Sequence, residues 1–556
     1  MDGFKEKLQK AGFTGDFTRD LTTRVEHSHD ASLFEIVPEA VAFPKTPADV
    51  AILTKLVAAE KKEHPGLSLT ARSAGTDMAG GAINESIIVS YTKYLNKIIS
   101  VTHEEATAQP GVYYRDFEVA TLKKHALMPS YPASKDLAAL GGIIGNNSGG
   151  EKSLEFGKTA DWVKELKVVF ADGVERVVRP LNKAQLTKKM AQKDFEGQVY
   201  KGVYELIEKH YDAIKAAKPS VSKNSMGYGI WDVWDRETGI FDLNRLIVGS
   251  EGTLGLTTEI TFRLTPKRPH SGLLVFFLKD INRLGETINT VLKHKPATFE
   301  GFDDQTMILF FKLMPSLLKT MGASAFFKLF FSLAPQAFME LKGYPKLILM
   351  VEFNGDSVEE VRNKIHALHQ DLALKNKQSH YNITAYEEDY TEEQSEKFWL
   401  MRRKSFQLLR SKVKDKHTAP FIDDFVVPPE VLPQFLPKLQ KIIRKYKLFA
   451  TIAGHMGDGN FHVIPLMKIE EESERKKLLP AMKEVNNLVL RYGGSLSGEH
   501  NDGLIRGPWL RDQFGSEILG VFKEAKKIMD PQGIFNPHKK ANATWQYSYN
   551  RIRKSF

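Results

Sequence analysis

Cysteine is absent from the 556 residues of this chain. Its absence excludes disulfide bonds, thiol catalysis and a cysteine-ligated iron–sulfur cluster within the chain. Long apolar runs are also missing: no uninterrupted stretch could span a bilayer, and the first residues lack the apolar core of a signal peptide. We therefore expect no secretion and no membrane-spanning helix. The length suffices for two or three domains with a large buried core.

Acidic residues are fewer than basic ones, with 68 Asp and Glu against 78 Lys and Arg and a formal net charge of +10. Such a balance is compatible with nucleic acid, an anionic membrane surface or anionic substrates as partners. The sequence contains no zinc finger, RNA-recognition signature or long basic arm. We therefore expect no nucleic-acid partner.

The segment 453–465, AGHMGDGNFHVIP, has the densest chemical pattern in the chain. His455 and His462 flank GDGN, a strong turn signal, between two apolar runs. Two strands joined by this turn would place both imidazoles at the same end of a hairpin. Glu499 and His500 follow in SGEHNDG, and two imidazoles with one carboxylate leave coordination positions open, as in a catalytic divalent metal site. A surface or capping role for these histidines is the alternative.

Two glycine-rich stretches in the first half of the chain are candidates for binding a cofactor phosphate. Residues 72–81 read RSAGTDMAGG, and residues 129–150 read PSYPASKDLAALGGIIGNNSGG. Small residues let the backbone approach a phosphate and point successive N–H groups at it. Neither stretch is a P-loop or opens a clear dinucleotide-binding βαβ fingerprint. An ordinary turn and a long irregular loop are the alternatives.

These segments, taken in order, resemble FAD-linked oxidases and dehydrogenases of 2-hydroxy acids. The strings GHMGDGNFH, SGEHNDG and MDPQGIFNP are similar to the C-terminal half of that group, which contains glycolate oxidase catalytic subunits, D-lactate dehydrogenases and D-2-hydroxyglutarate dehydrogenases. The two glycine-rich stretches resemble the FAD-binding domain shared by vanillyl-alcohol oxidase and p-cresol methylhydroxylase. Residues 155–173 and 246–266 continue the match, as does KNSMGYG at 223–229, which resembles a segment lining the cavity near the flavin.

The resemblance implies a role for individual residues. His455, His462 and Glu499 would bind zinc or manganese, and His500 would act as the catalytic base. Arg402, after a W-x-x-R motif, would hold the substrate carboxylate bidentately, with its neighbour Arg403 as the rival. The FAD would be held by Arg72, Ser73, Ala74, Gly75, Thr76, Asp77, Gly80, Gly81, Pro132, Ser134, Gly141, Gly142, Asn146, Gly150 and Ile260.

The attachment of the flavin is expected to be noncovalent. Some members of the family link FAD to a histidine at the position that Thr76 occupies in this chain. Threonine cannot form that histidyl bond. We therefore expect FAD to be held by phosphate contacts and burial.

The resemblance also implies the fold class, an α+β protein. A two-subdomain FAD-binding domain of the p-cresol methylhydroxylase (PCMH) type would occupy residues 1–268, and a ferredoxin-like α+β cap domain residues 269–504. The C-terminal segment 505–556 would return to the FAD domain. Two strand-like runs, 271–278 and 346–356, each precede a helical pattern, which favours such a cap.

An insertion at 305–342 interrupts the expected cap. Residues 305–339 contain no acidic residue but several phenylalanines and lysines, a combination typical of interfacial membrane binding. A buried insertion or a dimer contact is the alternative. We expect a cytoplasmic location, with peripheral attachment to the inner face of the cell membrane as an option that this insertion raises.

The resulting hypothesis is FAD-dependent oxidation of a small D-2-hydroxy acid, D-lactate-like, to the 2-oxo acid. Hydride would pass to flavin N5 while a metal and a histidine assist deprotonation of the hydroxyl. Since the chain has no cysteine, electrons must leave the FAD for a separate acceptor, which could be a quinone, an electron-transfer protein or a cytochrome.

Two departures from the family pattern bear on the substrate. Ile464 stands where D-2-hydroxyglutarate dehydrogenases have an asparagine, which argues against simple transfer of that substrate. Asp502 adds a carboxylate in GEHNDG, where the family usually reads G-E-H-G-I-G, and we expect it to lie near the site and to alter metal or substrate preference. A non-redox flavoenzyme resembling alkylglycerone-phosphate synthase, or a noncatalytic flavin-binding subunit of a larger oxidase, are the alternative functions.

Overall fold

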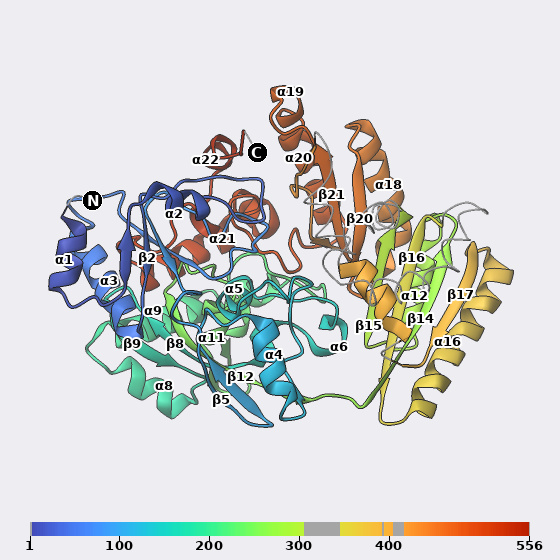
Figure 1. Cartoon of the computed structure of the whole chain (residues 1–556), viewed down its shortest axis with the longest axis horizontal. Coiled ribbons are helices and arrows are strands. Elements are labelled where there is room, and N and C mark those ends of the chain that lie inside the picture. The colour runs from blue at the N-terminus through green and yellow to red at the C-terminus, as the bar shows by residue number, and fades with distance from the viewer. Residues whose placement is uncertain (1–2, 305–344, 392–393, 404–415, 555–556) are drawn as a thin grey trace.

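The computed structural model of the chain describes residues 3–304, 345–391, 394–403 and 416–554, which form two lobes (Figure 1). The first lobe contains the first half of the chain together with the C-terminal helices. The second lobe runs from strand β14 (His270–Leu278) to helix α20 (Leu478–Arg491). The predicted insertion at 305–342 lies entirely outside the described residues. Among the described helices, none combines the length and apolarity that crossing a bilayer requires.

The first lobe is built on two sheets. One has the strand order β1 (Asp16–Thr18), β2 (Ala40–Phe43), β4 (Ile87–Ser90), β3 (Leu69–Arg72), with β4 parallel to both of its neighbours. The other is antiparallel, in the order β5 (Ile98–Val101), β6 (Glu105–Ala108), β12 (Leu256–Arg263), β8 (Val163–Val169), β9 (Glu175–Val178). The two sheets match the two subdomains expected for the first half of the chain.

Local sequence signals determine where the first long helix begins. Helix α3 (Pro47–Glu60) starts with a capping box, in which the Thr46 side chain accepts from the Asp49 amide and the Asp49 carboxylate accepts from the Thr46 amide. Pro47 occupies the first helical position, where no backbone donor is needed. Helix α3 packs against the five-stranded sheet through β8, β9 and β12.

The second lobe contains the expected ferredoxin-like unit. Strands β14, β15 (Thr298–Asp303), β16 (Leu347–Gly355) and β17 (Ile383–Asp389) pair antiparallel in the order β17-β14-β16-β15. Helix α12 (Leu284–Leu292) follows β14, and helix α16 (Val358–Ser379) follows β16. Strands β20 (Ala450–His455), β21 (Asn460–Met467) and β18 (His417–Thr418) extend this sheet beyond β15, so the strands that carry His455 and His462 are joined to the ferredoxin-like core.

The predicted hairpin is present and longer than the two apolar runs suggested. Strand β20 (Ala450–His455) and strand β21 (Asn460–Met467) are joined by a short 3-10 turn, η4 (Met456–Asp458), and Gly459. Gly459 has φ 65°, and a Cβ on it would lie 2.0 Å from the carbonyl oxygen of Val427. Only glycine fits this close approach, because a side chain would collide with backbone that cannot move away.

The C-terminal segment returns to the first lobe (Figure 1). Helix α21 (Leu510–Met529) packs against helix α9 (Phe195–Lys209). Phe535 then pairs with Leu69 of β3, and the Asn536 amide donates to the Leu69 carbonyl at 2.8 Å. The segment therefore supports the strand that leads into the first glycine-rich loop. The boundaries at 268 and 504 stay predictions.

Candidate active site

A cavity of about 450 Å³ lies where the two lobes meet. The two glycine-rich loops of the first lobe form one wall, and five charged or ionisable side chains from residues 402 to 500 form another. The wall from the later part of the chain consists of Arg402, Arg403, His462, Glu499 and His500. The predicted cofactor residues that line the cavity are Ser73, Ala74, Gly75, Thr76, Asp77, Gly81, Pro132, Ser134, Gly141, Gly142 and Asn146.

The first glycine-rich loop starts at the carboxyl end of β3. Gly75 has φ 66°, and a Cβ on it would lie 2.2 Å from the guanidinium of Arg72, which itself donates to the His29 carbonyl at 2.8 Å. Asp77 closes the loop by accepting from the Gly81 amide at 2.6 Å. Within the described chain, the amide N–H groups of residues 73–77 donate no hydrogen bond. These amides are available to the oxygens of a phosphate group.

The second loop presents bare backbone to the cavity. A Cβ added to Gly142 or Gly145, both in helix α5 (Leu140–Asn146), would meet no atom within 4 Å. Both residues line the cavity, so their missing side chains leave room for a flat group against the helix. Asn146 donates to Asp77 Oδ1 at 2.8 Å, which ties this loop to the first. The two loops together fit an FAD molecule.

Four predicted cofactor residues lie behind the cavity wall. Arg72 supports the first loop from below, and Gly80 packs against the ring of Phe34. Gly150 approaches the backbone of Tyr131 so closely that a Cβ would lie 2.1 Å from its carbonyl oxygen. Ile260 is fully buried in β12. These four residues are not among the described residues that line the cavity, so they lie behind the ones that do.

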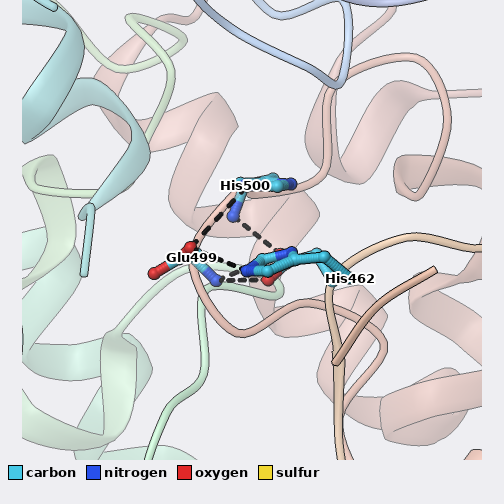
Figure 2. Close-up of side chains that lie close together, drawn as sticks. His462, Glu499 and His500 are labelled. Carbon is cyan, nitrogen blue, oxygen red and sulfur yellow. Dashed lines mark hydrogen bonds and ion pairs between the residues drawn. The ribbon is translucent and has the colours of Figure 1, made fainter. Parts of the chain in front are cut away.

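The histidines converge on one carboxylate oxygen. Glu499 Oε1 lies 3.1 Å from Nε2 of His455, 3.2 Å from Nε2 of His462 and 3.7 Å from Nε2 of His500. Figure 2 shows the last two imidazoles beside the glutamate. The ring centroids of His455 and His462 are 5.3 Å apart, which confirms that the hairpin brings them together. His455 is buried behind His462 and does not line the cavity.

The other ring nitrogen of each histidine also faces a carboxylate. Nδ1 of His455 lies 2.5 Å from Glu300 Oε1. Nδ1 of His462 and Nδ1 of His500 lie 3.1 and 2.7 Å from the two oxygens of Asp423. A metal-binding histidine typically donates its second N–H to a carboxylate in this way, which leaves Nε2 for the metal.

The charges of the cluster balance one another. Burial lowers the pKa of His462, but the hydrogen bond to Asp423 outweighs burial and raises that pKa to about 10. The pKa of His455 and of His500 is likewise raised, since carboxylates outweigh burial at both. Burial raises the pKa of Glu499, yet the neighbouring cations lower it well below its usual value. Protons on the imidazoles thus offset the buried carboxylates, and a divalent cation would displace such protons on binding.

The donor set fits a divalent metal. Asp424, His462, Glu499 and His500 each offer one ligand atom, and these four atoms lie within 4.8 Å of one another. Glu499 Oε2 is buried and accepts no hydrogen bond from the described residues, and the ammonium of Lys223 lies 3.7 Å from it as an ion-pair partner. Imidazole and carboxylate ligands suit zinc and manganese. His455, the remaining predicted ligand, reaches the same glutamate from the other side.

Both candidate anchors for a substrate carboxylate line the cavity and form ion pairs. Arg402 is 3.2 Å from Glu300 Oε2 through both Nε and Nη2. Arg403 Nε donates to Glu151 Oε2 at 3.2 Å. The contact of Arg402 with Glu300 links it to His455, a candidate metal ligand. Both guanidinium groups line the cavity, so both arginines remain candidates for binding a substrate carboxylate.

Sequence reasoning missed the acidic residues that orient the histidines. Asp424 accepts from the backbone amides of Glu499 and His500 at 3.0 and 2.7 Å, beside the contacts of Asp423 and Glu300 already described. The adjacent aspartates in IDDF, directly before strand β19 (Phe425–Val426), were the available signal. No comparable local pattern marks Glu300.

The additional carboxylate in GEHNDG lies away from the cavity. Asp502 pairs with Lys540 at 2.9 Å and accepts from the Gly227 amide at 2.9 Å. It is fully buried and, among the described residues, is not part of the cavity lining. The departure from the family pattern therefore ties the C-terminal segment to the loop that carries Glu499 and His500, and it adds no negative charge to the cavity.

Comparison with known families agrees with this site. Residues 38–179 match the family described as "FAD binding domain", and residues 267–540 match "FAD linked oxidases, C-terminal domain". The chain belongs to the FAD-linked oxidases. The family assignment made from the sequence motifs is confirmed.

Individual relatives differ in what their names say they oxidise. A D-2-hydroxyglutarate dehydrogenase of Pseudomonas putida is 29% identical over 96% of this chain and 51% of its own length. The glycolate oxidase subunit GlcD of Bacillus subtilis is 26% identical over 96% of each chain. A D-lactate dehydrogenase of Anaerostipes hadrus is 25% identical over 97% and 96%. The chain thus spans about half the length of the hydroxyglutarate relative.

Solved structures show the same fold. A crystal structure of p-cresol methylhydroxylase with substrate bound superposes with a TM-score of 0.66 at 12% identity, over 98% of this chain and 97% of that one. Alkyldihydroxyacetonephosphate synthase gives a TM-score of 0.63 at 14% identity, over 97% and 85%. The FAD-linked oxidase is therefore an α+β protein with a PCMH-type FAD-binding domain and a C-terminal oxidase cap, as predicted.

Proposed function

We propose that this FAD-linked oxidase oxidises a small D-2-hydroxy acid, D-lactate-like, to the corresponding 2-oxo acid. The observation that carries this proposal is the convergence of three imidazoles on Glu499 at the wall of the cavity that also holds the glycine-rich loops. When bound, FAD supplies a hydride acceptor and a zinc or manganese ion at His455, His462 and Glu499 supplies a Lewis acid for the substrate hydroxyl.

The chain's own residues account for the remaining steps. For the base step the imidazole of His500 must be neutral, so that Nε2 accepts the hydroxyl proton while Nδ1 stays hydrogen-bonded to Asp423. The hydrogen on the substrate carbon leaves with its electron pair, and the C–O bond becomes a carbonyl. Arg402 or Arg403 holds the substrate carboxylate and so decides which face of the substrate carbon meets the flavin.

The apolar surroundings of Ile464 favour a substrate with a short apolar side chain. Ile464 is buried on the same face of β21 as His462 and packs with Ala31, Met78 and Leu466. Met78 lines the cavity. A second carboxylate, as in 2-hydroxyglutarate, would lose its hydration against this wall without a compensating partner there.

The electron acceptor is proposed to be a separate molecule: a quinone, an electron-transfer protein or a cytochrome. The absence of cysteine removes an iron–sulfur route within this chain. A cytoplasmic location is proposed, with residues 305–339 as the contact to an anionic membrane surface. Those residues lie outside the described part of the chain, so this proposal depends on their composition alone.

Anaerobic flavin reduction tests the proposed function. The purified holoenzyme, mixed with D-lactate, should lose its flavin absorbance, whereas L-lactate should leave it unchanged. Parallel samples with glycolate and D-2-hydroxyglutarate would show which substrate side chain gives the fastest flavin reduction. A flavin that no 2-hydroxy acid bleaches, with metal present, would favour the noncatalytic subunit or the non-redox flavoenzyme.

A further inference from the structure

Two histidines with different proposed roles share one carboxylate. Asp423 Oδ1 lies 3.1 Å from Nδ1 of His462, and Asp423 Oδ2 lies 2.7 Å from Nδ1 of His500. The two imidazoles are stacked, with ring centroids 4.9 Å apart and an angle of 20° between their planes. Figure 2 shows them one above the other next to Glu499. The proposed metal ligand and the proposed base therefore have the same orienting partner.

Asp423 is held in place from two directions. It directly precedes Asp424 and β19, and β19 pairs with β21 at Phe425 and Phe461, which places the aspartate beside His462. Its own carbonyl accepts from Arg506 at 2.6 Å. The side chain is buried, and burial with two charged neighbours leaves it no alternative partner in solvent. The carboxylate cannot turn toward one histidine without leaving the other.

We propose that Asp423 is a positioning residue that fixes both imidazoles with hydrogen on Nδ1. Both Nε2 atoms then face Glu499 and the cavity, one for the metal and one for the substrate proton. This inference rests on the proposed function. It adds that metal binding at His462 and proton acceptance at His500 depend on one side chain and fail together when it is changed.

Neighbouring carboxylates provide matched controls, because each has different partners. Glu300 orients His455 alone among the three histidines. Asp424 accepts from the backbone amides of Glu499 and His500, and from the side chains of Ser497 and Asn460. Changing Glu300 should therefore disturb one imidazole, and changing Asp424 should disturb the loop backbone.

The test compares Asp423→Asn with Glu300→Gln as FAD-loaded proteins. An asparagine keeps the size but offers one acceptor oxygen, so it can orient only one of the two imidazoles. We expect Asp423→Asn to lower zinc or manganese affinity by about 10–100-fold. At saturating metal it should also reduce its flavin more slowly than wild type, with KM nearly unchanged. Glu300→Gln should lower metal affinity similarly and, because Glu300 also pairs with Arg402, should raise KM for the substrate, whereas at saturating metal and substrate its flavin reduction should slow less than that of Asp423→Asn.

A second comparison in the His500→Ala background separates positioning from general damage. There, adding Asp423→Asn should still weaken metal binding but should not slow flavin reduction further, because the histidine through which it acts is gone. A further slowing, or a loss of FAD in step with activity, would overturn the positioning role. So would an Asp423→Asn protein that reduces flavin at the wild-type rate.

The outcomes distinguish this inference from the proposed function. If wild type bleaches with D-2-hydroxy acids but Asp423→Asn behaves as wild type, only the inference fails. If wild type never bleaches, the proposed function fails, while metal affinity measured without substrate still tests the orientation of His462. Should Asp423→Asn not retain FAD, Asp423→Glu keeps the charge with a longer side chain, and the same losses in smaller measure are expected.

Discussion

Glu300 and His455 lie directly opposite each other on strands β15 and β20, and their side chains share a buried hydrogen bond of 2.5 Å between Oε1 and Nδ1. The other oxygen of the same carboxylate receives Arg402. One buried acid thus connects a candidate metal ligand with a candidate substrate anchor. A substitution of His455 or of Arg402 should therefore change the position of the other side chain through Glu300.

Removal of a proposed ligand should separate metal loss from flavin loss. Replacing His455 or His462 with alanine is expected to abolish turnover and to remove bound zinc or manganese, because each supplies an imidazole to Glu499. FAD occupancy should stay near normal, since the flavin loops belong to the other lobe.

His500→Ala should keep metal and FAD but slow the reaction by about 10²–10⁴-fold. Elemental analysis, flavin content and turnover, measured on the same preparations, separate metal loss from flavin loss and from loss of activity. A fully active His455→Ala protein with unchanged metal content would contradict the metal hypothesis.

Acid precipitation should release the flavin into the supernatant. Thr76 lines the cavity, and a threonine side chain cannot form a histidyl link to FAD. Absorbance of the supernatant and of the pellet measures the two fractions. Yellow colour that stays with the precipitated chain would contradict noncovalent binding.

Substrate preference should respond to residue 464. Ile464→Asn places an amide in the apolar cluster with Met78 and is expected to raise kcat/KM for D-2-hydroxyglutarate relative to D-lactate by about tenfold, the effect of roughly one hydrogen bond. Leu466→Asn is the matched control, because it changes the same cluster two residues farther along β21 from His462. An equal shift in both variants would show that polarity alone, rather than position, is responsible.

Stability at low pH should depend on the ion pair between Glu151 and Arg403. Burial works against ionisation of Glu151, but Arg403 outweighs it and lowers the pKa of that carboxyl to about 2. Since the folded-state pKa lies below the unfolded value of about 4.3, the contribution to the free energy of unfolding is full above about pH 4.3 and is lost as the pH falls toward 2. Wild type should therefore lose stability more steeply than Glu151→Gln across this window. Denaturant unfolding at a series of pH values measures both slopes, and parallel curves would refute the assignment.

Deletion of residues 305–339 should reduce binding to anionic vesicles while FAD stays bound. The expectation follows from the lysines and phenylalanines of this segment and from its lack of acidic residues. Co-sedimentation with vesicles that contain phosphatidylserine measures the difference, and neutral vesicles are the control. Unchanged binding after deletion would exclude this segment as the membrane contact.

The sequence predicted elements whose signals are local. The GDGN turn between two apolar runs determined the hairpin, and the capping box at Thr46 determined the start of α3. The partners of the histidines depend on strand register instead. Glu300 is 155 residues before His455, and Asp423 is 39 residues before His462. No periodicity within either segment reports which residues will lie opposite each other across a sheet.

The cofactor residues show the same division. Short motifs predicted two loops that the structure places along the cavity, where glycine and small residues let the backbone face it. The motifs could not separate the residues that face the cavity, such as Gly142, from those that support it, such as Gly150 and Ile260. That difference depends on whether neighbouring backbone already fills the space beside the residue.

The position of Glu499 and His500 on the segment that leaves the cap restricts how the molecule can open. Lys158 of the FAD lobe holds the Gly498 carbonyl at 2.6 Å, whereas His455 and His462 belong to the cap sheet. Asp424, beside the cap sheet, in turn accepts from the amides of Glu499 and His500, so a rigid-body rotation of the cap would break these bonds or pull the segment away from Lys158. Substrate and product are accordingly expected to exchange through the cavity mouth while the two lobes keep their mutual orientation. Turnover would then tolerate an engineered covalent cross-link between the lobes.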